Sequence, residues 1–263
     1  MCLLIFAHRV WPGHPLVLAA NRDEFYARET TASGFWPQYP KVLAGRDLRA
    51  GGTWMGVTRQ GRFAAITNYR DPSAGAVAAR SRGELTLDFL TGSTTPSAYL
   101  NEVGKNASQY AGFNLLLGDG KDMWHYSNRN EKTGHQASAP EQLKPGVYGL
   151  SNASLNTPWP KVELGKRRLN ELLCEAAPNH DTLLSIVGDR QQASAAALRL
   201  GTMETEMDQL LSAQFIMAGE YGTRSSTTLW TDDNSALNWR ELSFDKYGKI
   251  AGTASQKFIL ENG

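Results

Sequence analysis

Apolar residues near the start of the chain form two short continuous runs, which predict two buried strands. The runs Cys2–Ala7 and Leu16–Ala20 contain almost only apolar side chains. Between them, Trp11–Pro15 carries one glycine and two prolines, which are typical of a turn. A strand that is apolar along its whole length belongs to a sheet that is covered on both faces. The chain is therefore expected to open with a hairpin in the protein interior.

Groups of predicted strands and predicted helices alternate along the rest of the chain. Strands are expected at residues 51–57, 63–67, 113–117, 123–126, 147–150, 214–218, 226–230 and 239–244. Ser81 and Glu84 have the spacing of a capping box ahead of one helix, and further helices are expected at residues 96–110, 159–174 and around 182–187. Two pairs of helices outside two antiparallel sheets would satisfy this order, although the periodicity fits another α+β arrangement equally well.

The composition is that of an ordinary globular protein, with 41% hydrophobic and 20% charged residues. The 263 residues contain no internal repeat and no linker, so residues 1–263 are expected to form a single domain. The 27 basic residues are balanced by 26 acidic ones and form no clustered stripe, which argues against a nucleic-acid partner. These features do not define the oligomeric state.

Neither the start of the sequence nor its interior predicts export or a membrane span. Met1–Ala7 is too short for a signal peptide, lacks a basic start and runs directly into His8 and Arg9. No apolar segment reaches transmembrane length, so a cytoplasmic location is expected. The two cysteines, Cys2 and Cys174, and five scattered histidines argue against a disulfide framework and against a metal site.

Cys2 is the candidate nucleophile. Removal of Met1 is favoured when the next side chain is small, and cysteine meets that condition. Cys2 would then carry a free α-amine, whose ordinary pKa of about 7.7–8.0 allows it to act as a base near neutral pH. One residue would supply both nucleophile and base, so the chemistry needs no separate histidine. The alternative is that Cys2 is a small apolar residue of the core.

A polar tetrapeptide, Asn-Arg-Asp-Glu at residues 21–24, follows the second predicted strand. Charges at the end of a buried strand are expected to meet each other or a ligand. Alternation places Asn21 and Asp23 on one face and Arg22 and Glu24 on the other. Because the first two strands are expected to pair antiparallel, Asp23 or Asn21 could lie near the amine of Cys2. Alternatively, Arg22 and Glu24 form a structural ion pair.

The order of these segments resembles a known family. Met1-Cys2 at the start, with Asn21-Arg22-Asp23-Glu24 further on, resembles the NRDE family, which is named for that tetrapeptide and includes the animal transport and Golgi organisation protein. The family's later blocks look like Gly51-Gly52-Thr53-Trp54, Thr67-Asn68-Tyr69-Arg70, Ser151-Asn152 and Gly222-Thr223-Arg224-Ser225-Ser226-Thr227. The tetrapeptide alone is weak evidence, whereas all the blocks in this order are specific and cover nearly the whole chain.

The NRDE family is in turn similar to the cysteine acylases of the N-terminal-nucleophile superfamily, the penicillin V acylases and bile salt hydrolases. This similarity implies an α+β fold of the four-layer αββα sandwich type. It implies catalytic roles for Cys2 as nucleophile, Asp23 near its amine, Asn68 in the oxyanion hole, Asn152 holding the amine, and Arg224 as the acylases' late arginine. The alternative is structural: Asn68 and Asn152 cap turns, and Arg224 pairs with Asp23 or Glu24.

Three further residues are assigned to substrate binding. In the acylases two residues separate the arginine from the aspartate, whereas Arg22 and Asp23 are adjacent. Arg22 therefore either pairs with Glu24 or binds an anionic group of the substrate. Trp54 and Tyr69 lie in segments expected to rim the cleft, where aromatic walls suit an apolar acyl group or a flat macrocycle. Ordinary core packing is the alternative for both.

Two functions of different classes follow. The first is a cysteine N-terminal-nucleophile hydrolase, without a cofactor, that acts on an amide or other acyl bond of a small, partly apolar substrate. The second is a non-catalytic carrier of haem or of an acyl lipid such as acyl-CoA in the same cleft, as the resemblance to relatives linked to haem trafficking and lipid metabolism implies. The sequence has no Cys-x-x-Cys-His attachment motif, and the best axial-ligand candidates for haem are His8 and Cys2.

Overall fold

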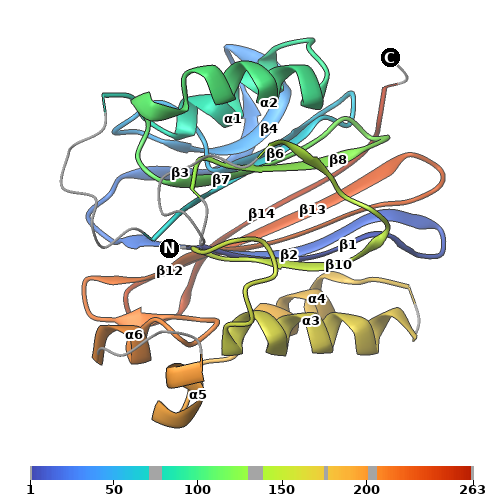
Figure 1. Ribbon diagram of the computed structural model, residues 1–263. Coiled ribbons are helices and arrows are strands. Elements are labelled where there is room, and N and C mark those ends of the chain that lie inside the picture. The colour runs from blue at the N-terminus through green and yellow to red at the C-terminus, as the bar shows by residue number, and fades with distance from the viewer. Residues whose placement is uncertain (1, 71–78, 130–138, 175–176, 201–205, 262–263) are drawn as a thin grey trace. The chain divides into compact units, whose positions relative to one another are not determined.

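The computed structural model describes residues 2–70, 79–129, 139–174, 177–200 and 206–261 (Figure 1). Contacts divide the chain into two compact units, each assembled from several stretches of sequence. The first unit comprises Met1–Ala27, Pro145–Ser151 and Leu155–Lys257, and the second comprises Arg28–Lys144, Asn152–Ser154 and Phe258–Gly263. Each unit has an antiparallel sheet with helices packed against it, which confirms the predicted α+β class.

The sheet of the first unit has the strand order β10-β1-β2-β12-β13-β14, and β11 pairs with β12. The predicted opening hairpin is present as β1 and β2, which lie inside this order because β10 and β12 flank them. The strands are β1 (Cys2–Trp11), β2 (His14–Phe25), β10 (Gly146–Leu150), β11 (Met217–Ala218), β12 (Tyr221–Thr231), β13 (Ala236–Phe244) and β14 (Ile250–Ile259).

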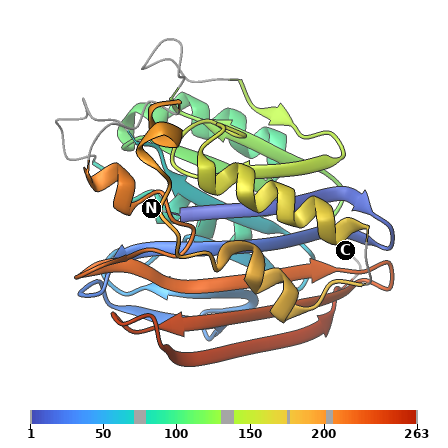
Figure 2. The ribbon, with the colours of Figure 1, turned by 90° about the horizontal axis from the view of Figure 1, so that it is seen from below.

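Two helices lie on one face of this sheet. α3 (Pro160–Leu173) contacts β1 and β10, and α4 (His180–Val187) contacts β2 and β12; Figure 2 shows both helices, in yellow and light orange, lying across the strands. The approach of α3 is close, because a Cβ atom added to Gly165 would lie 2.6 Å from Ile5 Cγ1. Ile5 therefore points toward α3. The unit also contains α5 (Ala195–Leu200) and α6 (Glu206–Leu210).

The sheet of the second unit is a meander, in which each strand pairs with the next along the chain from β3 to β9. Its strands are β3 (Thr30–Trp36), β4 (Tyr39–Asp47), β5 (Met55–Thr58), β6 (Phe63–Asn68), β7 (Phe113–Gly118), β8 (Met123–Ser127) and β9 (Glu141–Gln142). The helices of this unit are α1 (Gly83–Thr91), α2 (Pro96–Lys105) and the 3-10 turn η1 (Ala107–Gln109). α1 packs on β4, β5 and β6, and α2 packs on β8.

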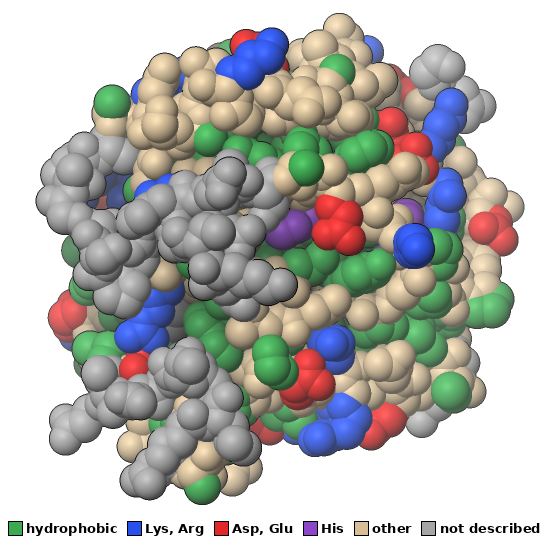
Figure 3. Space-filling view, in the orientation of Figure 1, with side chains coloured by type: hydrophobic (Ala, Val, Ile, Leu, Met, Phe, Trp, Pro, Cys, Tyr) green, Lys and Arg blue, Asp and Glu red, His purple; other side chains and the backbone are tan. Residues whose placement is uncertain are grey.

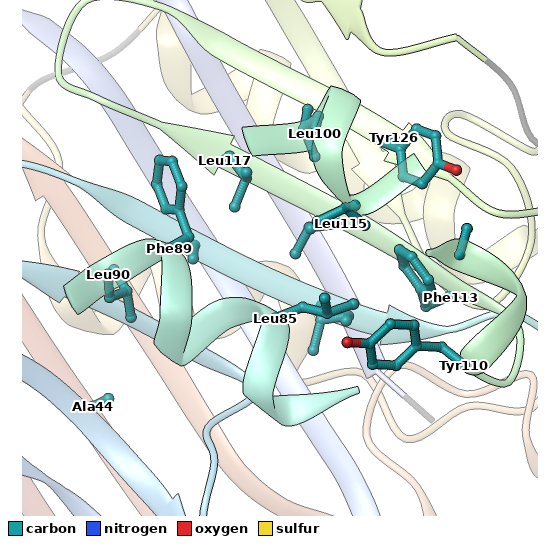
Figure 4. Packing of buried hydrophobic residues seen from close by; sticks show 14 of the residues in the cluster. Ala44, Leu85, Phe89, Leu90, Leu100, Tyr110, Phe113, Leu115, Leu117 and Tyr126 are labelled. Carbon is teal, nitrogen blue, oxygen red and sulfur yellow. The ribbon is translucent and has the colours of Figure 1, made fainter. Parts of the chain in front are cut away.

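A hydrophobic core joins the helices of the second unit to their sheet (Figure 4). The alternate residues Phe113, Leu115 and Leu117 of β7 point to the same face of the sheet, where Leu85 and Phe89 of α1 meet them. Each of these five side chains is at least 97% buried, and full burial of one such side chain stabilises a fold by about 1.5–3 kcal/mol. This core determines which face of the second sheet the helices cover.

Several boundaries differ from the prediction. β2 continues through the polar tetrapeptide to Phe25, because alternation allows its buried and exposed positions to coexist in one strand. The capping-box prediction is wrong, since α1 begins after Arg82 and no side chain caps it. The strand expected at 214–218 shortens to Met217–Ala218, because the backbone N–H of Phe215 donates to the carbonyl of Asp189 instead of to a strand.

Strands β3, β4 and β14 have no counterpart in the prediction. They mix apolar residues with small, polar and exposed ones, and β14 is exposed or half-buried at every position. Period-2 alternation is weak in such sequences. β3 and β14 are edge strands, and β4 begins with three exposed residues, so a prediction based on hydrophobic runs missed all three.

The surface agrees with the balanced composition. Acidic and basic side chains are interspersed over the face shown in Figure 3, as the 27 basic and 26 acidic residues predict. Within the described ranges, every helix is too short or too polar to cross a membrane.

Gly165→Ala is expected to destabilise the protein, although alanine normally favours a helix by roughly 0.5–1 kcal/mol over glycine. The added methyl group would overlap the fully buried side chain of Ile5, and overpacking typically costs about 1–3 kcal/mol. Urea denaturation should show a lower free energy of unfolding. Gly104→Ala in α2 is the control, because its Cβ would come no closer than 3.6 Å to Tyr126; equal stabilities of the two variants would contradict the close packing of α3 on β1.

Candidate active site

Cys2 is the first residue of β1, a strand flanked by β10 and β2. The residue is only 9% exposed and its thiol forms no disulfide. Ser151, which directly follows β10, holds this end of the strand, because its Oγ donates a hydrogen bond to the Cys2 carbonyl oxygen at 2.8 Å. The predicted nucleophile therefore has a fixed backbone.

The register of the sheet places Cys2 beside Arg22. Cys2 pairs with Arg22 of β2, and Arg22 pairs with Ser225 of β12. Directly paired residues of antiparallel strands present their side chains on the same face, and neighbouring strands lie about 4.8 Å apart. Cys2, Arg22 and Ser225 thus form a row across three strands. Ile5, three positions after Cys2, points to the opposite face, toward α3.

The surroundings of Cys2 favour the neutral thiol. Burial raises the pKa of the Cys2 thiol above its ordinary value, and the negative charge of Asp23 raises it further. The positive charge of Arg22 and a hydrogen bond from the backbone N–H of Asp23 lower the pKa without reversing the shift. Cys2 therefore needs a base to become a nucleophile near neutral pH.

Asp23 is a buried carboxylic acid, 2% exposed, at the same end of the sheet. Its Oδ1 accepts a hydrogen bond from Thr223 Oγ1 at 2.7 Å, and Thr223 Oγ1 in turn accepts one from the backbone N–H of Ile216 at 2.8 Å. The bond from Ile216 orients the hydroxyl so that its proton points to Asp23. Burial raises the pKa of Asp23, whereas the charge of Lys161 and the bond from Thr223 lower it.

Asn21 has a structural role. Its Nδ2 donates to the carbonyl oxygens of Val187 and Gln214, both at 2.8 Å, and its Oδ1 accepts from Ser226 Oγ at 2.6 Å. The side chain is fully buried and joins β2 to the end of α4 and to the segment before β11. Alternation placed Asn21 and Asp23 on the same face of β2. Asn21 stabilises the fold, whereas Asp23 lies next to Cys2.

Arg224 occupies a β-bulge. Thr223 pairs with Asp23 and Ser225 pairs with Arg22, so Arg224 is the extra residue of β12 at this bulge. Its Nη1 donates to the carbonyl oxygen of Phe25 at 2.8 Å. Burial lowers the pKa of Arg224, and the positive charge of Arg22 lowers it further. The two guanidinium groups are thus electrostatically coupled.

The predicted alternative for Arg22, an ion pair with Glu24, is not what the structure contains. Glu24 Oε1 accepts a hydrogen bond from the backbone N–H of Phe25 at 2.9 Å. Within the described part of the chain, Arg22 and Glu24 form no salt bridge. Arg22 is half-buried on the face of Cys2, where it can meet an anionic group of a substrate.

The two candidate asparagines meet each other in the second unit. Asn68 is the last residue of β6 and is exposed, whereas Asn152 is 1% exposed. Asn152 Nδ2 donates to the backbone oxygen of Asn68 at 2.7 Å, and the backbone N–H of Arg70 donates to the Asn152 carbonyl at 2.7 Å. Asn152 therefore holds the backbone on which the Asn68 amide is mounted.

The predicted aromatic residues differ in their surroundings. Trp54 is half-buried and packs against the hydrophobic core of the second unit, which agrees with the core-packing alternative. Tyr69 directly follows Asn68, and its backbone N–H donates to the Gly112 carbonyl at 2.8 Å. Tyr69 is therefore next to the Asn68 amide in the chain, and its half-buried side chain remains a candidate for substrate contact.

Lys161 and Thr223 are residues of the site that the sequence did not single out. Lys161, in the first turn of α3, is 2% exposed and its Nζ donates to the Leu211 carbonyl at 2.9 Å. A lysine of an amphipathic helix normally extends its ammonium into water, so no sequence signal marked it. Thr223 lies within the Gly222–Thr227 block, but a threonine in a strand is too common to be assigned a role.

The structure limits the axial-ligand prediction for haem. His8 and Cys2 lie on one strand, six positions apart, and a strand rises about 3.3 Å per residue, so they are about 20 Å apart. The two residues cannot ligate one iron together. Among the described residues, His, Cys, Asp and Glu form no group of three that could hold a metal ion.

Comparison with known proteins relates the chain to one family. Residues 1–246 match the family model described as Transport and Golgi organisation 2. The Transport and Golgi organization 2 homolog of Mus musculus is 34% identical over 284 residues, which cover 100% of both chains. The Homo sapiens homolog is also 34% identical with 100% of both chains covered, and the Drosophila melanogaster protein is 28% identical over 66% of this chain and 65% of its own.

The fold was also compared with solved structures. The N-acylethanolamine-hydrolyzing acid amidase ortholog of Caenorhabditis elegans covers 87% of this chain and 92% of its own with a TM-score of 0.50 and 11% sequence identity. A variant of the conjugated bile acid hydrolase from Clostridium perfringens covers 98% of this chain and 96% of its own with a TM-score of 0.43 and 10% identity. The likeness to the amidase confirms the expected N-terminal-nucleophile hydrolase-like fold; at 11% identity it speaks for the fold alone.

Asp23→Asn is expected to stabilise the protein at neutral pH. Because the pKa of Asp23 is raised in the folded state, its contribution to stability is fully present below its unfolded pKa of about 4 and is lost as the pH rises through the folded value. Urea titrations should show a larger free energy of unfolding for the variant at pH 7, with the difference shrinking toward pH 4.

Asp47→Asn is a control of opposite sign, because the Asp47 carboxylate forms a 2.7 Å ion pair with Arg28 whose loss should slightly lower stability at pH 7. A destabilised Asp23→Asn variant at pH 7 would show that the charge of Asp23 supports the fold.

Proposed function

The chain belongs to the Transport and Golgi organisation 2 family, and on that premise we propose that it is a cysteine N-terminal-nucleophile hydrolase acting on an amide or other acyl bond of a small, partly apolar substrate. The observation that carries this proposal is the placement of Cys2. It begins a flanked strand, with Arg22 as its register partner and the Asp23 backbone N–H on its sulfur. An ordinary core cysteine would need neither neighbour.

The α-amine of Cys2 supplies the base in this proposal. Loss of Met1 would expose that amine at the end of β1 where Asp23 lies. Because the pKa of the thiol is raised, the reaction needs a proton acceptor close to the sulfur, and an amine with a pKa of about 7.7–8.0 is suited to that role. The carboxylate of Asp23 would hold the ammonium form.

The reaction proceeds in two half-reactions. The thiol proton passes to the α-amine, the sulfur attacks the acyl carbon, and the tetrahedral oxyanion collapses as the leaving group takes the proton from the ammonium. The α-amine then takes a proton from water, the hydroxide attacks the thioester, and the carboxylic acid leaves as the thiol is restored. No metal or redox cofactor is needed for either half-reaction.

The Asn68 side-chain amide is the proposed donor to the oxyanion. Its residue is exposed at the end of β6, and the bond from Asn152 fixes its backbone. An amide in this role stabilises the transition state only if its position is preorganised, and loss of one such donor typically costs about 2.7–4 kcal/mol. Asn152 is therefore proposed to act through Asn68, in addition to the amine contact that the acylase resemblance implies.

Arg22 and Arg224 would recognise the substrate. Burial lowers the pKa of Arg224, and the like charge of Arg22 lowers it further, because like charges that share a site disfavour each other. An anionic group on the substrate would relieve this repulsion, and Tyr69 would contribute an apolar surface. The proposed substrate therefore combines an acyl bond with a negative charge and a partly apolar body.

Processing provides a first test. Protein purified from its native host is expected to lack Met1, because Cys2 can use its amine only after that residue is removed. Intact-mass spectrometry measures this directly. Retention of Met1 in most molecules would exclude the proposed base and leave the fold unaffected.

Acylation provides the main test. Incubation with an activated ester such as p-nitrophenyl butyrate is expected to add one acyl group at Cys2, located by peptide mass spectrometry, at a rate that rises with pH because burial raises the pKa of the thiol. Cys2→Ser should reduce kcat by more than about 10²-fold while changing KM little, since it removes an interaction made in the transition state.

Cys174→Ser is the matched control, because Cys174 is the other free cysteine and is exposed. It should leave turnover unchanged. Saturable binding of haemin without acylation of Cys2 across a panel of esters and amides would favour the carrier instead.

A further inference from the structure

Asn114 connects the two segments that carry the candidate asparagines. It lies on β7, is fully buried, and pairs with Thr67 of β6 in the sheet register. Its Nδ2 donates to Thr67 Oγ1 at 3.0 Å and to the Ala153 carbonyl oxygen at 2.9 Å. One side-chain amide thus bridges the residue before Asn68 and the residue after Asn152.

The hydrogen bonds between these segments run in both directions. Asn152 donates from the loop to the backbone of Asn68, and Asn114 donates from the sheet to the backbone of Ala153. The backbone N–H of Arg70 adds a third bond to the loop, at the Asn152 carbonyl. Together they fix residues 152–153 against the end of β6.

Only the donor side of the Asn114 amide is used. Its Oδ1 is buried and has no hydrogen-bond partner within the described residues, whereas Nδ2 donates both hydrogen bonds of the side chain. An isosteric aspartate would place an oxygen against the Ala153 carbonyl oxygen, which can only accept a hydrogen bond. The position therefore requires the N–H₂ group of asparagine.

We propose that Asn114 is a positioning residue that holds the Asn68–Asn152 pair in place for oxyanion stabilisation; this inference rests on the proposed hydrolase function. Asn114 acts through its neighbours and touches no reacting atom. Its loss would release the loop at Ala153 and the strand at Thr67, and a misplacement of about 1 Å in a catalytic group can lower a rate by about 10²-fold.

The test compares Asn114→Asp with the unchanged protein by steady-state hydrolysis of p-nitrophenyl butyrate. The variant is expected to lose about 10²-fold in kcat with little change in KM. Alkylation of Cys2 by iodoacetamide should keep its rate, because that reaction forms no oxyanion. Hydrogen exchange should accelerate in peptides that cover residues 66–70 and 150–156.

Asn128→Asp is the matched control. Asn128 is 2% exposed in the same unit, and its Nδ2 donates to the carbonyl oxygens of Ala107, Tyr110 and Ala111, so this variant should lose stability without losing kcat in the folded fraction. If Asn114→Asp does not fold, Thr67→Val and Thr67→Ser replace it. The valine removes the acceptor for Asn114 and should lower kcat, and the serine keeps the acceptor and should restore most of it.

The outcomes separate the two proposals. Equal kcat values in Asn114→Asp and Asn128→Asp, or in Thr67→Val and Thr67→Ser, would overturn the role of Asn114. Absence of turnover and of Cys2 acylation in the unchanged protein would overturn the hydrolase function. In that case hydrogen exchange at residues 66–70 still tests whether Asn114 positions the end of β6. Unchanged exchange in Asn114→Asp would overturn that positioning role as well.

Discussion

A carboxylate inside a sheet costs several kcal/mol unless charges and hydrogen-bond donors compensate for its lost hydration, and β2 carries one at Asp23. The compensation comes from three separate stretches of the chain: the Thr223 hydroxyl on β12, the ammonium of Lys161 on α3, and the guanidinium of Arg22 next to it. These groups can act on Asp23 together only if β12 pairs with β2 and the first turn of α3 lies near the end of β2 that carries Asp23. The requirements of Asp23 therefore account for much of the arrangement of the first unit.

Asn21 and Asp23 show how one strand face can serve both stability and chemistry. Both are buried, and each accepts a hydrogen bond from a hydroxyl group of β12. Both polar atoms of the Asn21 amide form hydrogen bonds within the protein, so its role is structural. Asp23 keeps a raised pKa in the folded state, and its ionisation therefore lowers stability at neutral pH. If the role of this position were purely structural, an asparagine would avoid that cost. Such a retained cost is typical of functional positions.

The sequence predicted the site residues of the first unit better than their partners. The apolar runs placed Cys2 on a buried strand, and alternation assigned Asn21 and Asp23 to one face, because both inferences need only neighbouring residues. Lys161 could not be predicted, since the carbonyl that accepts from its ammonium belongs to Leu211, which is distant in sequence. Asn114 could not be predicted either, because one asparagine within the apolar run Phe113–Leu117 gives no sign of its acceptors on β6 and at Ala153.

The bulge at Arg224 explains why alternation alone could not place the late arginine. Asn21 and Asp23 are two residues apart, but their hydroxyl partners, Ser226 and Thr223, are three apart. A regular strand presents only residues separated by an even number on one face, so both bonds can form only if β12 carries one extra residue. That residue is Arg224, and the bulge redirects it out of the ladder beside Arg22. The same hydrogen bonds that bury the tetrapeptide therefore place two guanidinium groups at the end of the sheet that bears Cys2.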